Sequence, residues 1–572
     1  VVVAHGVTDT HAQLPRRTVL AAGAAGATLA GTTIAFSPAD ARGAAGAKVF
    51  RHGIASGDPT AHAVLLWTRV TPTPESTPGS GKGPRVTVTW QVARDPGFRD
   101  VVRRGTVETA PWRDHTVKVD VDGLAPGRWY FYRFHCAGVT SRTGRTRTAP
   151  APDTLPDHLR FGVVSCANWQ AGWFSAYRGL AARDDLHAVL HLGDYLYEYA
   201  PGQYGYGQSE RDIRPHHPAR EMVALADYRQ RHAQYKTDPD LQDAHAKFPW
   251  IITWDDHEVT NDQWRRGGEN HQPDEGDYLR RRARAHRAFD EWMPVRMDAT
   301  AKLGDGDRLF RRLKFGELAE ISMLDLRTYR SKQVDQVAFP APAADPAISD
   351  PDRTITGDQQ LAWLRDSLDN RRAQWKVIGN PVMIAPVNFA SVPDDLVQPV
   401  NDVTGLLPED GAPYNVDQWD GYTADRRRVF RHIRDRGVKD ALFVTGDIHS
   451  GWACELPYDA STYPLGDSAG VEFVCSSVTS NNLKDITGSP PRTTSVAVEE
   501  GIKANNRHVK YLNFDDHGFS VLDLTPKRAQ MDWFVISDRA DRNATIRHET
   551  SWATRSGTGR IEQVDRPVGG AR

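Results

Sequence analysis

Side chains that are typical metal ligands follow five short apolar runs of the sequence. They are Cys166, Asp194 with Tyr197, Asp256 with His257, Asn380, and Asp447 with His449. Taken singly, an Asp at such a place usually caps a helix, and a buried Cys usually packs as a small hydrophobic residue. Burying several ionisable groups together is costly unless a cation neutralises them. Because the same event recurs after five runs, the sequence predicts a metal site.

The runs that must position these side chains have the length of strands and alternate with amphipathic stretches. The expected strands are 161–165, 188–192, 250–254, 375–379 and 441–445, with a strand pair over 309–325 that turns near Gly316. The expected helices are 221–234, 277–292, 359–370 and 424–436. This order is typical of an α/β (α+β) sandwich with mixed sheets, which we expect over 155–545. In such sheets the groups beyond the carboxyl ends of the strands share one crevice.

The segment before this region alternates with a period of two. Val86, Val88 and Trp90 alternate with polar residues, and turn residues at 123–127 precede an aromatic strand at 129–132. We therefore predict an all-β sandwich over 46–150 that resembles a fibronectin III or Ig-like domain. Packing is its favoured role, with carbohydrate binding as the alternative. Residues 546–572 are expected to be a flexible C-terminal tail.

The first 45 residues resemble a twin-arginine export signal. Arg16 and Arg17 precede an uncharged run at 18–38, and an Ala-x-Ala site follows at 39–41. Such a signal is read by the twin-arginine export machinery and then removed. A membrane anchor is the weaker alternative, because many Ala and Gly make the run a poor apolar span. We expect a secreted or cell-wall-associated protein without a transmembrane anchor.

The composition narrows the function classes. The chain has 572 residues, of which 39% are hydrophobic, and a formal net charge of −2. This excludes a polytopic membrane protein and a wholly disordered chain, and it gives no global basic field for a specific nucleic-acid reader. Four cysteines exclude a disulfide scaffold. A disulfide between Cys454 and Cys475 stays open, and Cys136 is expected to be buried.

Three ordered motifs make the resemblance to a family specific. They are Gly-Asp-x-x-Tyr at 193–197, Asp-Asp-His-Glu at 255–258 and Gly-Asp-Ile-His at 446–449. They are similar to the metallophosphatase signature of purple acid phosphatases, from which the chain departs at Cys166, Asp256 and Asp447. Those departures, with the export signal and the preceding sandwich, resemble the PhoD family of exported alkaline phosphatases and phosphodiesterases. The resemblance extends from about Phe50 to about residue 540.

The resemblance implies metals and ligands. It implies one Fe³⁺ with one or two Ca²⁺. A thiolate, a phenolate, a carboxylate and an imidazole suit iron, which gives Cys166, Tyr197, Asp194 and His449 as one ligand set. An all-oxygen set of Asp194, Asp256 and Asp447 suits calcium. Asn380 is included as a further calcium ligand, and Asn261 competes with it for that place.

The resemblance also implies catalytic roles. His257 matches the residue that gives a proton to the leaving oxygen, which is work that suits an imidazole. Glu258 either orients His257 or serves as a structural hydrogen-bond partner, the second being favoured. Arg327 is the candidate for binding a phosphate oxygen, and its alternative is a salt bridge to Asp325 or another carboxylate. His517 lies either near the site or on a surface turn.

We therefore expect a secreted phosphoesterase that hydrolyses phosphate monoesters and diesters through a metal-activated hydroxide. Its substrate is a phosphate ester, and a phospholipid is one candidate. The alternative enzyme is a phospholipase D acting on phospholipid diesters. The alternative of another class is an inactive cell-surface binding protein, against which the intact set of candidate ligands argues.

Overall fold

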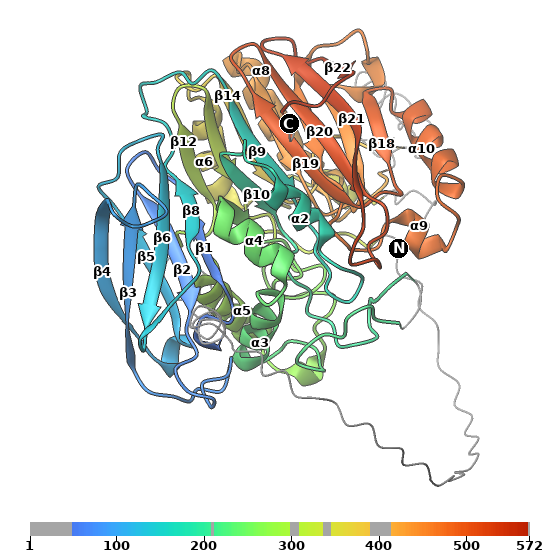
Figure 1. The fold of residues 1–572 in the computed structure, drawn as a ribbon. Coiled ribbons are helices and arrows are strands. Elements are labelled where there is room, and N and C mark those ends of the chain that lie inside the picture. The colour runs from blue at the N-terminus through green and yellow to red at the C-terminus, as the bar shows by residue number, and fades with distance from the viewer. Residues whose placement is uncertain (1–47, 208–210, 298–307, 336–344, 389–412, 570–572) are drawn as a thin grey trace, which may run out of the picture.

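The computed structural model describes residues 48–207, 211–297, 308–335, 345–388 and 413–569. Two large sheets lie face to face, and helices cover their outer faces (Figure 1). In the described ranges, no helix is both long enough and apolar enough to cross a membrane. The twin-arginine segment predicted over 1–45 lies outside the described residues.

The larger sheet has ten strands in the order β22-β21-β20-β19-β9-β10-β11-β1-β2-β5. Their bounds are β1 Ile54–Gly57, β2 Val64–Arg69, β5 Thr116–Val121, β9 Leu159–Val164, β10 Ala188–Leu192, β11 Pro249–Thr253, β19 Gly518–Leu524, β20 Arg528–Ile536, β21 Ile546–Arg555 and β22 Ile561–Val564. Strands β9, β10 and β11 are parallel neighbours. Their carboxyl ends therefore meet at one edge, and the three strands predicted there are confirmed.

The second sheet has seven strands in the order β12-β13-β14-β15-β17-β16-β18. Their bounds are β12 Arg311–Phe315, β13 Ala319–Met323, β14 Trp375–Asn380, β15 Ala441–Thr445, β16 Gly451–Pro457, β17 Ser468–Val474 and β18 Val509–Asn513. Strands β13, β14, β15 and β17 run parallel. The predicted strand pair is confirmed, because β12 and β13 are antiparallel and Gly316 turns between them with φ of 65°.

Alternation along the central strands builds three apolar layers. In β11, Ile251 packs between the two sheets, whereas Trp250 and Ile252 face the helices. The helices on the ten-stranded side are α2 Ser175–Ala182, α3 Leu225–Tyr235, α4 Pro239–Lys247 and α5 Tyr278–Trp292. Those on the other side are α6 Asp358–Leu368, α8 Thr423–Arg436 and α10 Thr494–Asn505. The four predicted helices are confirmed, although α3 begins later than predicted because Asp227 accepts the backbone N–H of Ala224.

Short helical turns complete the described elements. They are α9 Leu483–Thr487, η1 Pro111–Arg113, η2 Pro273–Glu275, η3 Pro346–Ser349, η4 Trp419–Gly421 and η5 Ala460–Thr462.

The N-terminal sandwich shares a sheet with the rest of the chain. Its outer sheet runs β4-β3-β6-β7, with β8 on β6. The bounds are β3 Val86–Ala93, β4 Val101–Thr109, β6 Trp129–Cys136, β7 Val139–Thr140 and β8 Gly144–Arg147. Its other sheet is β1, β2 and β5, and β1 pairs in parallel with β11. The all-β sandwich is present, but it continues the large sheet because β11 hydrogen-bonds to β1.

The prediction of a flexible tail over 546–572 is wrong. Strand β21 pairs with β20 from Arg528 to Ile536, and β22 pairs with β21, so both extend the large sheet, drawn in red in Figure 1. The Trp552 ring stacks on Tyr511, with ring centroids 6.3 Å apart. The segment has no continuous apolar run, because β21 is buried only in part and no residue of β22 is fully buried.

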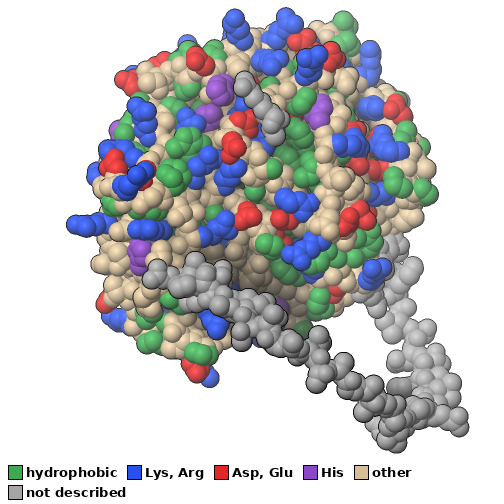
Figure 2. Space-filling view, in the orientation of Figure 1, with side chains coloured by type: hydrophobic (Ala, Val, Ile, Leu, Met, Phe, Trp, Pro, Cys, Tyr) green, Lys and Arg blue, Asp and Glu red, His purple; other side chains and the backbone are tan. Residues whose placement is uncertain are grey.

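Acidic and basic side chains are interspersed over the face of the molecule in Figure 2. This distribution agrees with the formal net charge of −2. On this face there is no broad field of one sign to grip a polyanion.

Candidate metal centre

The backbone turns sharply where three strands, β9, β10 and β15, end at the shared edge. Cys166, Asp194, Asp447 and His449 all have positive φ, between 55° and 62°. Residues other than glycine adopt this left-handed conformation at a cost of about 1–3 kcal/mol each, and such strain concentrates at functional sites. Two backbone contacts join the ends, since the Cys166 N–H donates to the Gly193 carbonyl and Ser165 forms a bridge to Ser477.

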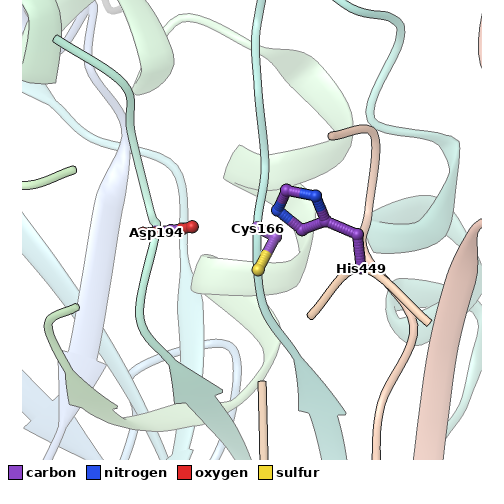
Figure 3. Close-up of side chains that lie close together, drawn as sticks. All are labelled: Cys166, Asp194 and His449. Carbon is purple, nitrogen blue, oxygen red and sulfur yellow. The ribbon is translucent and has the colours of Figure 1, made fainter. Parts of the chain in front are cut away.

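The first ligand group is Cys166, Asp194 and His449, whose ligating atoms all lie within 4.8 Å of one another. Figure 3 shows the three side chains converging from separate segments of the chain. The Tyr197 hydroxyl completes the group, because it donates to Asp194 Oδ2 at 2.8 Å and lies 3.3 Å from His449 Nε2. All four residues predicted as the iron ligands are thus brought together.

The protein fixes which nitrogen His449 can offer. Its Nδ1 lies 2.8 Å from the Asn481 carbonyl oxygen, which can only accept, so Nδ1 carries the proton. Nε2 keeps its lone pair on the side of Tyr197. Burial lowers the pKa of His449 to about 3, so the ring is neutral. A neutral imidazole held through its other nitrogen is the usual form of a metal ligand.

Burial disfavours the ionised forms of the acidic members of this group. Burial, reinforced by neighbouring acids, raises the pKa of Cys166 and of Tyr197 well above their ordinary values. Burial also raises the pKa of Asp194 to about 8. Asp194 Oδ1 is buried and has no hydrogen-bond partner. An orphaned carboxylate oxygen beside a thiol and a phenol fits a bound metal ion, which would satisfy all three.

A second group shares Asp194. Ligating atoms of Asp194, Asp256 and His257 lie within 4.8 Å of one another. Asp447 lies on the far side of Arg327, whose Nη2 is 3.3 Å from Asp447 Oδ1 and whose Nη1 is 3.6 Å from Asp256 Oδ2. Burial and nearby carboxylates raise the pKa of Asp447 well above its ordinary value. Of the three carboxylates predicted for calcium, Asp256 and Asp447 therefore lie against one guanidinium, whereas Asp194 lies with Asp256 and His257.

Arg327 is held by carboxylates on every side. Its Nη2 donates to Asp255 Oδ2 at 2.8 Å, and its Nη1 is 2.8 Å from Asp417 Oδ2. Asp325 accepts the Arg327 backbone N–H and makes no ion pair with the guanidinium. Of the two interpretations, the salt-bridge arrangement is the one seen in the structure. The guanidinium also lies beside the second group, because its Nη1 is 3.6 Å from Asp256 Oδ2.

The structure does not place either asparagine candidate in these groups. The Asn380 amide donates to Thr445 and Glu472, and its oxygen accepts from the Trp419 indole at 3.1 Å. Asn380 is therefore part of a buried network beneath the site. Asn261 is half-buried and donates its amide to Glu269 at 3.1 Å.

Glu258 has the structural role that the sequence analysis favoured. Its carboxylate accepts the backbone N–H groups of Asp194, Tyr195 and Asp255 at 3.2, 2.6 and 2.9 Å. It thereby ties the loop after β10 to the loop after β11. His517 is buried and bonds to Ser477 and Asp485, so it does not lie on a surface turn.

His257 pairs with a residue that sequence reasoning missed. Its Nδ1 lies 2.7 Å from Glu198 Oε2, and both side chains are buried. Burial alone would lower the pKa of His257, but Glu198, Asp256 and Asp194 together raise it well above its ordinary value. The available signal was the position of Glu198 directly after Tyr197. Asp417, which follows 389–412 and pairs with Arg327, gave no sequence signal.

All four cysteines are free and buried. Cys454 packs on the helical side of the seven-stranded sheet, whereas Cys475 packs between the sheets. The Cys475 sulfur lies 3.3 Å from Ser165 Oγ. Cys454 and Cys475 form no disulfide. Cys136 is buried as predicted.

Comparisons with known proteins show the family of the chain. The family model of the PhoD-like phosphatases matches residues 161–533, and that of their N-terminal domain matches 36–150. Alkaline phosphatase D of Bacillus subtilis (strain 168) is 35% identical over 503 residues, which cover 88% of this chain and 80% of that protein. A solved structure of PhoD has a TM-score of 0.79 and 33% identity, covering 91% of this chain and 93% of its own. A purple acid phosphatase from yellow lupin (Lupinus luteus) seeds is far less similar, with a TM-score of 0.46, 12% identity and coverage of 88% and 73%.

Fold, site and these similarities define a hydrolase of phosphoric esters. Within that class, the chain belongs to the PhoD-like phosphatase family. The expected fold, a sandwich of mixed sheets preceded by an all-β domain, is confirmed.

Asp194→Asn should weaken metal binding at both groups, because its carboxylate is the member that the two candidate groups share. Elemental analysis of purified protein should show a loss of at least about tenfold, since changes that only touch a ligand's partner already cost 10- to 100-fold in affinity. Asp243→Asn, an exposed residue of α4, is the matched control and should keep its metals. Full metal content in Asp194→Asn would remove this residue from the ligand set.

The same variant should change how the metal-free protein responds to pH. The pKa of Asp194 is about 8 in the folded state and near 3.8 when exposed. Between these values the folded state keeps a proton that the unfolded state has lost, so the free energy of unfolding falls as pH rises. Asp194→Asn should flatten this fall, by at most on the order of 5 kcal/mol. Thermal unfolding at about pH 5 and about pH 8 measures it, and equal slopes in both proteins would contradict the expectation.

Proposed function

We propose that this chain is a secreted, metal-dependent phosphoesterase that hydrolyses phosphate monoesters and diesters. The observation that carries the proposal is the pair of candidate metal groups joined through Asp194, in a chain of the PhoD-like phosphatase family. A bound metal pair supplies Lewis-acid activation of a phosphate oxygen and of water. Cys166, Asp194, Tyr197 and His449 would hold one ion, and Asp194, Asp256 and Asp447 the other.

The ligand types support iron in the first metal group and calcium in the second metal group. A thiolate and a phenolate beside a neutral imidazole favour a redox-capable transition metal over a hard alkaline-earth cation. Oxygen ligands from carboxylates favour Ca²⁺. Asp194 belongs to both groups and its Oδ1 has no hydrogen-bond partner, so this residue would help to hold both ions.

His257 is the group of this chain that can hold a proton for the leaving oxygen. Its ring nitrogen lies within 4.8 Å of ligating atoms of Asp194 and Asp256, so it borders the second metal group. Tyr197 packs against its ring, with centroids 4.2 Å apart, which limits rotation of the imidazole. A fixed imidazole near the reacting phosphate can act as a general acid.

Turnover by metal-loaded protein tests the function. We expect hydrolysis of p-nitrophenyl phosphate and of bis-p-nitrophenyl phosphate, because activation of a phosphate oxygen and of water serves both esters. A panel with glycerophosphodiester, nucleic-acid diester and phosphatidylcholine vesicles then ranks the substrates. Choline release from the vesicles as the dominant activity would indicate the phospholipase D alternative. Turnover of no ester would contradict the proposal and leave the inactive binding protein.

Removing the thiolate or the phenolate should lower iron content. Cys166→Ser and Tyr197→Phe should each lose iron by elemental analysis, and Tyr197→Phe should also lose the visible phenolate-to-iron absorption band. Tyr204→Phe is the matched control, because Tyr204 stacks on Tyr197 and its phenol meets only the proton-bearing nitrogen of His449. Full iron occupancy in either ligand variant would exclude that residue.

We further propose export through the twin-arginine machinery, supported by Arg16, Arg17 and the uncharged run that follows them. The mature protein should then begin near Arg42. Replacing both arginines by lysine should retain the precursor in the cytoplasm, measured by comparing cell extract and culture medium. An unchanged amount of exported protein in the double variant would refute this route.

A further inference from the structure

Glu198 is a buried carboxylate that uses both of its oxygens. Oε2 lies 2.7 Å from His257 Nδ1. Oε1 accepts the Asn261 backbone N–H at 2.7 Å and the Asn270 amide at 3.0 Å. A buried carboxylate is costly unless such donors satisfy it, and here three donors do so.

These contacts decide how His257 is presented. Because an ionised carboxylate can only accept, the proton between the two groups belongs to His257 Nδ1. Nε2 is then the nitrogen left to meet a substrate. The ring is fixed in two directions, by the Glu198 hydrogen bond in its plane and by the Tyr197 ring against its face.

The neighbouring residues Tyr197 and Glu198 contact different parts of the site, the first metal group and His257. The Tyr197 hydroxyl bonds to Asp194 and approaches His449, whereas the next side chain reaches His257. One loop after β10 therefore sets the distance between the ligand group and the proton-bearing imidazole.

We propose that Glu198, held by the 261–270 loop, is a positioning residue that fixes the tautomer and orientation of His257, so that Nε2 faces the leaving oxygen of the phosphate ester. This inference rests on the proposed phosphoesterase function and deepens it. The Glu198 carboxylate contacts none of the side chains assigned above to the two ions, and it acts through His257.

The first test compares Glu198→Gln with His257→Ala in metal-loaded full-length protein. Glu198→Gln keeps the shape of the side chain but removes its negative charge. It also puts an amide N–H group at one of the two positions where Glu198 accepts hydrogen bonds. We expect it to keep its metals and lose about 10- to 100-fold in kcat on glycerol phosphate. The loss on p-nitrophenyl phosphate should be much smaller, because that leaving group departs without a proton.

The double variant separates positioning from a structural role. If Glu198 acts only through His257, adding Glu198→Gln to His257→Ala should change kcat on glycerol phosphate by less than about twofold. Losses that multiply in the double variant would overturn the proposal, as would loss of metal in Glu198→Gln or equal impairment on both esters. Failure of wild-type protein to hydrolyse p-nitrophenyl phosphate would instead contradict the phosphoesterase function itself.

Two further variants guard against misfolding and nonspecific effects. Glu269→Gln makes the same chemical change at an exposed neighbouring residue, whose carboxylate accepts from the Asn261 side chain. In this variant the ratio of activity on glycerol phosphate to activity on p-nitrophenyl phosphate should stay at the wild-type value. Asn270→Ala keeps Glu198 and His257 but removes one donor to Oε1. It should lower activity on glycerol phosphate selectively, by less than Glu198→Gln does. A selective loss in Glu269→Gln as large as that in Glu198→Gln would overturn the proposal.

Discussion

Concentrated burial of acidic groups at one edge of the two sheets is the constraint on which the rest of the site depends. A thiol, a phenol and several carboxylates share a space in which Asp194 Oδ1 finds no partner. Such groups cannot all ionise in a medium of low dielectric unless positive charge is supplied. Part of that charge comes from Arg327, which contacts Asp255, Asp417 and Asp447. His257, within 4.8 Å of Asp194, supplies another part. Among the described residues, no cationic side chain makes an ion pair with Asp194, and the pKa of Asp194 stays raised to about 8, so a metal ion fits the remaining demand around Cys166 and Asp194.

The surrounding contacts hold this arrangement in place. Glu258 binds the backbone of two strand ends through three N–H groups, so the loops after β10 and β11 keep their spacing. The Asn481 carbonyl fixes the tautomer of His449. Cys166, Asp194 and His449 have positive φ values, and this backbone conformation has an energetic cost that accompanies the placement of their side chains in the site. The extended sheets on both sides supply the rigidity that sustains this cost.

Sequence patterns were most informative where one physical rule dominated. The runs at 188–192 and 441–445 coincide with β10 and β15, since continuous apolar residues are required in strands that are buried on both faces. The rule failed at 546–572, where β21 and β22 are only partly buried and their pattern resembles that of a solvated segment. It also gave no sign that β1 would pair with β11, because a parallel pairing between distant segments depends on which edge is open.

By itself, the sequence determined the chemistry available to this protein. Cys166, Asp194, Tyr197 and His449 could be assigned to one place because each lies in the loop that follows a strand, and parallel strands end at a common edge. Only the tertiary structure decided the partners. It joined Arg327 to Asp417, placed Asn380 in a network with Glu472, and set Glu198 rather than Glu258 against His257. These choices depend on side-chain directions and loop paths over distances of a few ångströms. A linear pattern specifies the end of a strand, but it does not specify the direction in which the loop beyond it turns.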